Sequence, residues 1–94
     1  METNENLREQ IFVVIKNQMD ENNPPETNET YNRLIKEGYS DYEAKQLIGQ
    51  CVAVELYNVL KHSKPFDEER YVNNLKQLPQ KPYDWIWIFP EIRK

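Results

Sequence analysis

Apolar side chains recur at three- and four-residue spacing in the first part of the chain, which predicts an amphipathic helix over residues 4–22. They are Leu7, Ile11, Val14, Ile15 and Met19. The Asn23-Pro24-Pro25 sequence ends this helix, because proline disfavours helical backbone in the residue before it. The same prolines suit the first turn of a second helix, with Asn23 as its predicted N-cap and Gly38 as its left-handed stop. The inner face of the second helix is expected to carry Thr27, Tyr31, Leu34 and Ile35.

Two further helices are predicted from their capping signals. Ser40 as N-cap and Glu43 three residues later form a capping box that opens a helix ending near His62. Asp67 can cap a fourth helix, which Pro79 ends. Apolar pairs flank both N-caps as hydrophobic staples, Tyr39 with Ala44 and Phe66 with Tyr71.

The C-terminal stretch differs from the rest, because prolines bracket a run of aromatic and β-branched residues. This run, which we call the apolar segment, is Trp85, Ile86, Trp87, Ile88 and Phe89. We expect it to be extended, with Trp85, Trp87 and Phe89 on one side and the two isoleucines on the other. The predicted fold class is therefore all-α: a compact four-helix domain over residues 4–79, followed by an extended apolar C-terminal segment over residues 80–94, packed on the domain or on a partner.

Composition removes several classes of function. The 94 residues carry a net charge of −4, which gives no attraction to phosphate backbones or anionic lipid, so we expect no nucleic-acid and no membrane partner. The acidic start gives no sign of export, and one cysteine allows no internal disulfide, so we expect a cytoplasmic protein. Only two glycines occur, far apart, so no glycine-rich phosphate cradle can form. No cofactor is expected.

Two polar residues lie where apolar ones are expected. Glu55 falls on the face of the third helix that carries Ala44, Ile48 and Cys51, and Gln18 falls in the centre of the apolar stripe of the first helix. We expect a buried polar cluster in which the Glu55 carboxylate accepts a hydrogen bond from at least one of Gln18, Tyr31 and Tyr71. A ligand site or a buried general base at Glu55 is the alternative.

A metal centre and a cysteine nucleophile are both disfavoured by helical rise. Cys51 and His62 would lie about 16 Å apart along one helix, and Glu55 and His62 about 10 Å apart. A zinc ligand lies about 2 Å from the metal, so neither pair can share one ion. We expect Cys51 to be a small core residue, His62 to be a helix-end residue, and no metal to be bound.

A wider set of residues resembles a family of small uncharacterised bacterial proteins classed as a domain of unknown function. The set is Gln18, Pro24-Pro25-Glu26, Arg33-Leu34, Gly38, Ala44, Leu47-Ile48, Glu55-Leu56-Tyr57 and Tyr71 through Leu78-Pro79. It spans about two-thirds of the chain. The resemblance implies an all-α bacterial cytoplasmic domain and brings no activity, substrate or catalytic residue.

The chain has more apolar surface than four short helices easily cover. Residues 11–15 are apolar around the whole first helix, and a second apolar stripe follows the third helix. We therefore expect a non-catalytic protein-interaction or self-associating module. Three roles for the apolar segment stay open: closing its own core, forming a homodimer, or docking on a different protein. The alternative class is a small ligand-binding protein or enzyme that uses Glu55.

Overall fold

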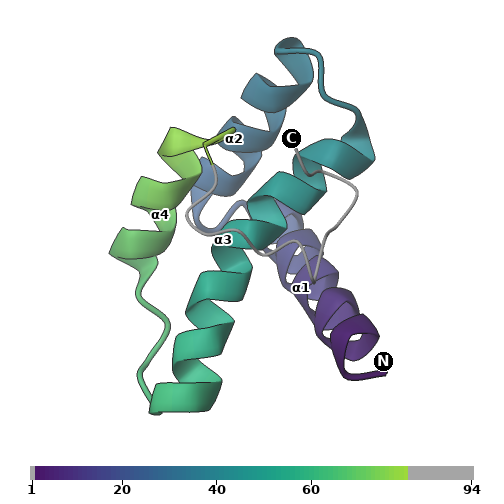
Figure 1. The fold of residues 1–94 in the computed structure, drawn as a ribbon. Coiled ribbons are helices and arrows are strands. Elements are labelled where there is room, and N and C mark those ends of the chain that lie inside the picture. Colours follow the sequence, from purple (N-terminus) through teal and green to yellow (C-terminus); the bar gives the residue numbers. More distant parts are fainter. Residues whose placement is uncertain (1, 81–94) are drawn as a thin grey trace.

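The computed structural model describes residues 2–80, which form four helices (Figure 1). These are α1 (Glu2–Glu21), α2 (Pro25–Lys36), α3 (Asp41–His62) and α4 (Glu68–Gln77). The all-α four-helix fold is confirmed. Residues 81–94, which include the predicted apolar segment, lie outside the described residues.

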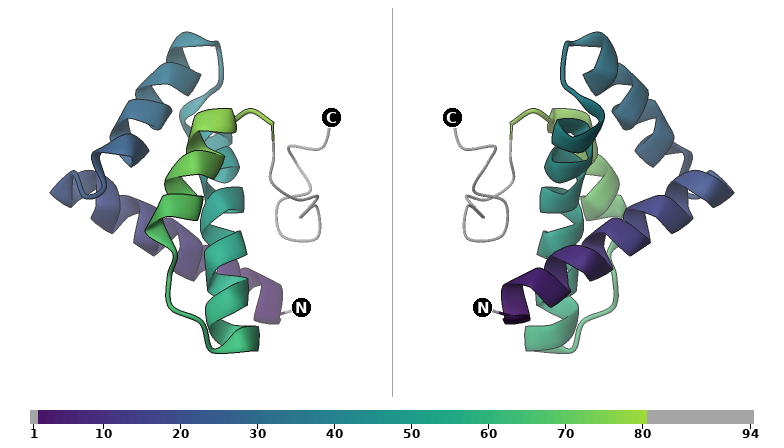
Figure 2. Two further views of the ribbon diagram at one scale, coloured as in Figure 1. Left: turned by 90° about the vertical axis from the view of Figure 1, so that its left-hand side faces the viewer. Right: turned by 90° about the vertical axis from the view of Figure 1, so that its right-hand side faces the viewer.

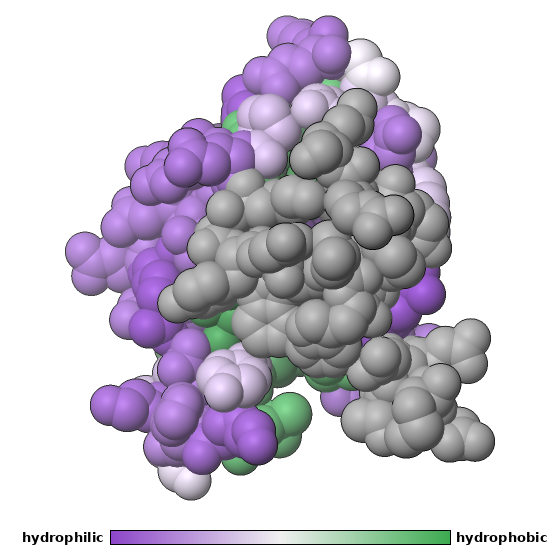
Figure 3. Space-filling model, in the orientation of Figure 1, coloured by the Kyte–Doolittle hydropathy of each residue, from purple (hydrophilic) through white to green (hydrophobic). Residues whose placement is uncertain are grey.

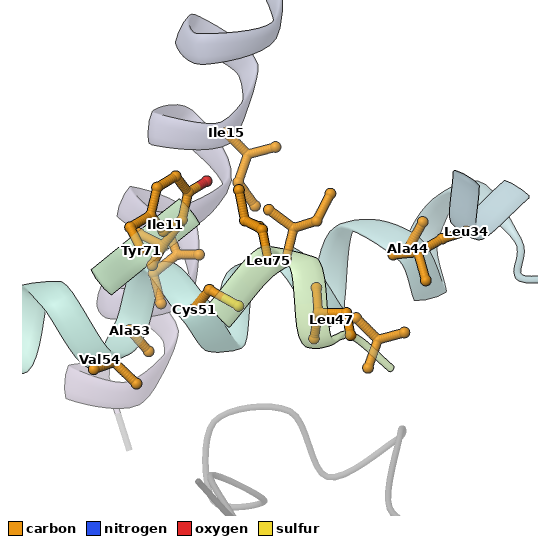
Figure 4. Close-up of a cluster of buried hydrophobic side chains, with 13 residues drawn as sticks. Ile11, Ile15, Leu34, Ala44, Leu47, Cys51, Ala53, Val54, Tyr71 and Leu75 are labelled. Atoms are coloured by element: carbon orange, nitrogen blue, oxygen red, sulfur yellow. The ribbon is translucent and has the colours of Figure 1, made fainter. Parts of the chain in front are cut away.

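The helix α3 is the centre of the fold. It packs against each of the other three helices, while α2 also packs against α1 and α4. Figure 2 shows α2 and α4 on one side of α3 and α1 crossing it at an angle. The buried apolar core draws on all four helices and on Leu78 (Figure 4). Its members are Ile11, Ile15, Leu34, Ala44, Leu47, Ile48, Cys51, Val52, Ala53, Val54, Tyr71, Leu75 and Leu78.

Most of the predicted helix ends are confirmed. The Ser40 side chain accepts from the Glu43 N–H, and the Glu43 side chain accepts from the Ser40 N–H, which completes the capping box. Gly38 has φ +105°, a conformation that favours glycine at the end of α2. The Asp67 side chain accepts from the Arg70 N–H at the start of α4. The rings of Phe66 and Tyr71 meet edge to face with centroids 5.4 Å apart, as the staple predicts.

Two predictions about α2 were wrong. Asn23 does not cap the helix, since Pro24 occupies the N-cap position and provides no side-chain cap. Ile35 is 38% exposed, because Thr27, Thr30 and Leu34 form the inner face instead. At about 100° per residue, Ile35 lies about 100° around the helix from Leu34, at the edge of that face.

Arg33 of α2 closes the C-terminal end of α4. Its Nη1 donates to the carbonyl of Leu78 at 2.7 Å and its Nη2 donates to the carbonyl of Leu75 at 3.0 Å. The last carbonyls of a helix have no partner within the helix, so a charged donor from a neighbour satisfies them. This contact ties α2 to α4.

We expect Arg33→Met to lower the free energy of unfolding by about 1 kcal/mol, because two carbonyls lose a charged donor while the aliphatic stem is kept. Lys36→Met is the matched control, since Lys36 is an exposed cation on the same helix. Urea unfolding of both variants measures the difference. Equal effects would show that the contact with α4 does not stabilise the fold.

Candidate functional site

Glu55 is completely buried, as its place on the inner face of α3 predicts. Its Oε1 accepts from the Asp67 backbone N–H at 2.9 Å and from Arg70 Nη2 at 3.0 Å. Its Oε2 accepts from Arg70 Nε at 2.6 Å. The guanidinium thus binds the carboxylate in a bidentate ion pair with two parallel hydrogen bonds, which is the strongest geometry for such a pair. The ion pair fixes the first turn of α4 against α3.

The expected partners of Glu55 were wrong, because none of Gln18, Tyr31 and Tyr71 donates to it. Arg70 supplies the positive charge that a buried carboxylate needs, and its side chain is 41% exposed, so the guanidinium still contacts water. The connection between α3 and α4 is short and turns the chain back, which brings the first turn of α4 beside Glu55. A cation at this position on α4 was the available sequence signal, and it was missed.

Gln18 and Tyr71 form a separate cluster with Thr27. The Tyr71 hydroxyl donates to Gln18 Oε1 at 2.7 Å, and the Thr27 hydroxyl donates to the same oxygen at 2.8 Å. The two hydroxyl oxygens lie 3.2 Å apart. Two hydroxyl hydrogens serve three oxygen pairs, so two of the three contacts can be hydrogen bonds at one time. The cluster joins α1, α2 and α4 through one amide oxygen.

Tyr31 belongs to neither group. Its hydroxyl donates to Asp41 Oδ1 at 2.6 Å, at the N-terminal end of α3. This hydrogen bond, helped by the charge of Lys45, lowers the pKa of the Asp41 carboxyl. The same bond raises the pKa of Tyr31. The single predicted cluster is therefore three separate contacts, each joining different helices.

A cavity of about 510 Å³ lies along the connection between α3 and α4. Its lining is Lys64, Pro65, Phe66, Asp67, Glu68 and Arg70. Glu55 does not line this cavity, since Arg70 and the Asp67 backbone stand between them. A carboxylate behind a guanidinium can take a proton from a bound molecule only if Arg70 moves away. The arrangement therefore has the geometry of a structural ion pair.

Cys51 is buried in the core, and burial together with the nearby charge of Glu55 raises the pKa of its thiol to about 12. Among residues 2–80, no three His, Cys, Asp or Glu side chains group closely enough to hold a metal ion. Elemental analysis of the purified protein tests the prediction that no metal is bound.

We expect the Cys51 thiol of the folded protein to react with a disulfide reagent at pH 8 at least about 100-fold more slowly than the thiol of the urea-unfolded chain, because only the thiolate attacks. The raised pKa also predicts a pH effect on stability. The folded thiol keeps its proton above pH 9.0, where the unfolded thiol loses it, so its contribution is complete below pH 9.0 and is lost as the pH rises toward about 12. Equally fast labelling of folded and unfolded protein would contradict the buried placement.

None of the helices in the described part of the chain is long and apolar enough to cross a membrane. The described residues form an all-α, four-helix domain in which hydrogen bonds and an ion pair join the helices. Residues 1–77 match the model of the family described as domain of unknown function (DUF1841), and the chain belongs to this family. The family resemblance is confirmed. No curated protein and no solved structure matches the chain.

Proposed function

We propose that this protein is a non-catalytic interaction module of the cytoplasm that binds a protein partner or a second copy of itself through the apolar segment Trp85–Phe89. Its partners on this proposal are proteins, and neither nucleic acid nor membrane. The segment lies outside the described residues, so the support comes from its composition and from the surface of the four helices. Five consecutive apolar residues with both sides apolar need cover on both sides.

The observation that carries the proposal is the exposure of large apolar side chains on the described helices. Leu60 is 71% exposed and Tyr57, one turn before it, is 43% exposed. On α1, Val13 is 56% exposed, although an apolar run around a whole helix predicts cover on every side. Figure 3 shows hydrophobic surface beside the last turns of α3. Leu60 and Tyr57, one turn apart, form a small apolar patch on α3, and exposed apolar patches are typical of interaction sites.

The alternative is a ligand site or a general base at Glu55. It is not favoured, because the carboxylate is buried and bonded within the fold. Both of its carboxylate oxygens accept hydrogen bonds from within the fold, and its exposed fraction is zero. A site that binds a small molecule needs polar groups that point into a cavity. Glu55 points instead to the inside of the fold.

Truncation after Lys81, followed by light scattering, tests the proposal. A folded monomer that replaces a dimer of the full chain supports assembly through the segment. A full-length protein that stays monomeric at high concentration, and that captures no protein from its native bacterium, overturns the proposal. An unfolded product shows that the segment closes its own core, and Ile86→Asp with Ile88→Asp in the full chain then tests association without removing the backbone.

A further inference from the structure

One face of α3 is buried although it lies away from the side on which α2 and α4 pack (Figure 2). We call it the outer face, and its members are Gln46, Gln50, Ala53 and Val54, each at most 3% exposed. At about 100° per residue, Gln46, Gln50 and Ala53 lie roughly 120–180° around α3 from the centre of the Ala44, Cys51 and Glu55 face. Figure 4 shows Ala53 and Val54 pointing away from Tyr71 and Leu75.

The described helices do not supply the cover for the outer face. In Figure 2, α2 and α4 lie on one side of α3 and α1 crosses it, which leaves one side of α3 with no described helix over it. Side chains at 1% to 3% exposure need atoms packed over them. The cover must therefore come from elsewhere in the chain or from another chain.

The outer face also holds an acceptor without a donor. Gln50 is 1% exposed, and its Oε1 accepts no hydrogen bond from the described residues. Leaving a buried acceptor unsatisfied costs about 1–3 kcal/mol, so native proteins rarely tolerate one. The cover of this face should carry an N–H or O–H group among apolar atoms.

We propose that the apolar segment of the same chain docks on the outer face of α3, with the Trp85, Trp87 and Phe89 side inward and an indole N–H donating to Gln50 Oε1. The inference rests on the proposed function in one respect: this docking leaves Ile86 and Ile88 as the side that meets a partner.

Position and reach favour this occupant. The described chain continues beyond α4, and Figure 2 shows its yellow-green end on the side of α3 that no described helix covers. The 14 residues 81–94 can span about 46 Å when extended, whereas the 22 residues of α3 are about 33 Å long. The chain after Gln80 is therefore long enough to bring the apolar segment alongside the helix.

Chemistry selects the side that faces inward. The outer face has no charged side chain, and the apolar segment has none either. A tryptophan carries a large apolar ring and one N–H donor, which matches an apolar face that contains one unsatisfied acceptor. The isoleucine side of the segment has no side-chain donor for the Gln50 oxygen.

The test uses the full-length chain, in which Trp85 and Trp87 are the only two tryptophans. Each indole N–H gives one resonance in a nitrogen-15 NMR spectrum, and we expect both to exchange with solvent at least about tenfold more slowly than in a synthetic peptide of residues 81–94. Gln50→Leu should return the exchange of one indole N–H toward the peptide rate. Ile35→Gln, at an exposed position of α2 on the other side of α3, is the matched control and should change neither resonance.

Two outcomes would overturn the inference. One is exchange at the peptide rate in the unaltered protein, and the other is equal spectra for Gln50→Leu and Ile35→Gln. Ala53→Lys provides a second test that does not depend on the hydrogen bond: a charge on the outer face should shift tryptophan emission to the red while circular dichroism of the helices persists. If Ala53→Lys does not fold, the comparison of Gln50→Leu with its control variant decides.

Dilution separates this inference from the proposed function. Protection of the indoles that persists in a dilute monomer supports docking within one chain. Protection that appears only with the dimer assigns the outer face to the segment of a second copy, which overturns docking within the chain and leaves the proposed function standing. If the indoles are protected but the protein binds no partner and no second copy, the docking inference stands and the proposed function is wrong.

Discussion

Arg70→Ala is expected to lower the free energy of unfolding by about 3 kcal/mol, because it leaves the buried Glu55 carboxylate with the Asp67 N–H as its only hydrogen-bond donor among residues 2–80. Breaking a buried ion pair from one side costs more than the pair contributes, since an uncompensated charge stays behind. For a chain of this length, the loss corresponds to a fall in melting temperature on the order of 15 °C. Thermal and urea unfolding measure it.

Two comparisons isolate the ion pair. Lys76→Ala removes an exposed cation from the same helix and should change stability by less than about 0.5 kcal/mol. Glu55→Leu combined with Arg70→Met removes both charges and should be more stable than Arg70→Met alone, because no charge is left unpaired. If Arg70→Ala resembled Lys76→Ala, the carboxylate would be satisfied by some other group and the ion pair would be of little consequence.

The helices could be predicted from the sequence because their signals are local. A capping box at Ser40 and Glu43, a glycine after α2 and prolines between helices act within one or two turns, so neighbouring residues determine them. The N-cap of α2 was mistaken because both Asn23 and Pro24 fit the start of a helix, and only the backbone path decides between them.

The polar contacts could not be predicted because they join helices. The burial of Glu55 follows from the periodicity of one helix, but its partner depends on which turn of α4 lies beside it. A shift of one turn along α4 moves a side chain by about 5.4 Å, which is enough to replace one partner with another. The hydrogen bonds that Thr27 and Arg33 make to other helices were missed for the same reason, since each contacts a residue more than 40 positions away.

Tyr71→Ala is expected to lower the free energy of unfolding by about 4 kcal/mol, because the side chain is completely buried and its hydroxyl contacts α1 and α2. The substitution removes the packing against Phe66 and the hydrogen bond to Gln18 together. The total free energy of unfolding of a native protein is only about 5–15 kcal/mol, so the variant should be partly unfolded at moderate temperature. Circular dichroism during heating measures the effect.

Tyr71→Phe separates the ring from the hydroxyl. It keeps the packing and removes one donor, while Thr27 continues to donate to Gln18 Oε1, so the expected loss is only about 1 kcal/mol. Thr27→Val added to Tyr71→Phe leaves the amide oxygen without either donor and should cost more than the two single changes added together, because each single variant keeps one hydrogen bond. If Tyr71→Phe were as damaging as Tyr71→Ala, the shared oxygen of Gln18, rather than packing of the ring, would hold these helices together.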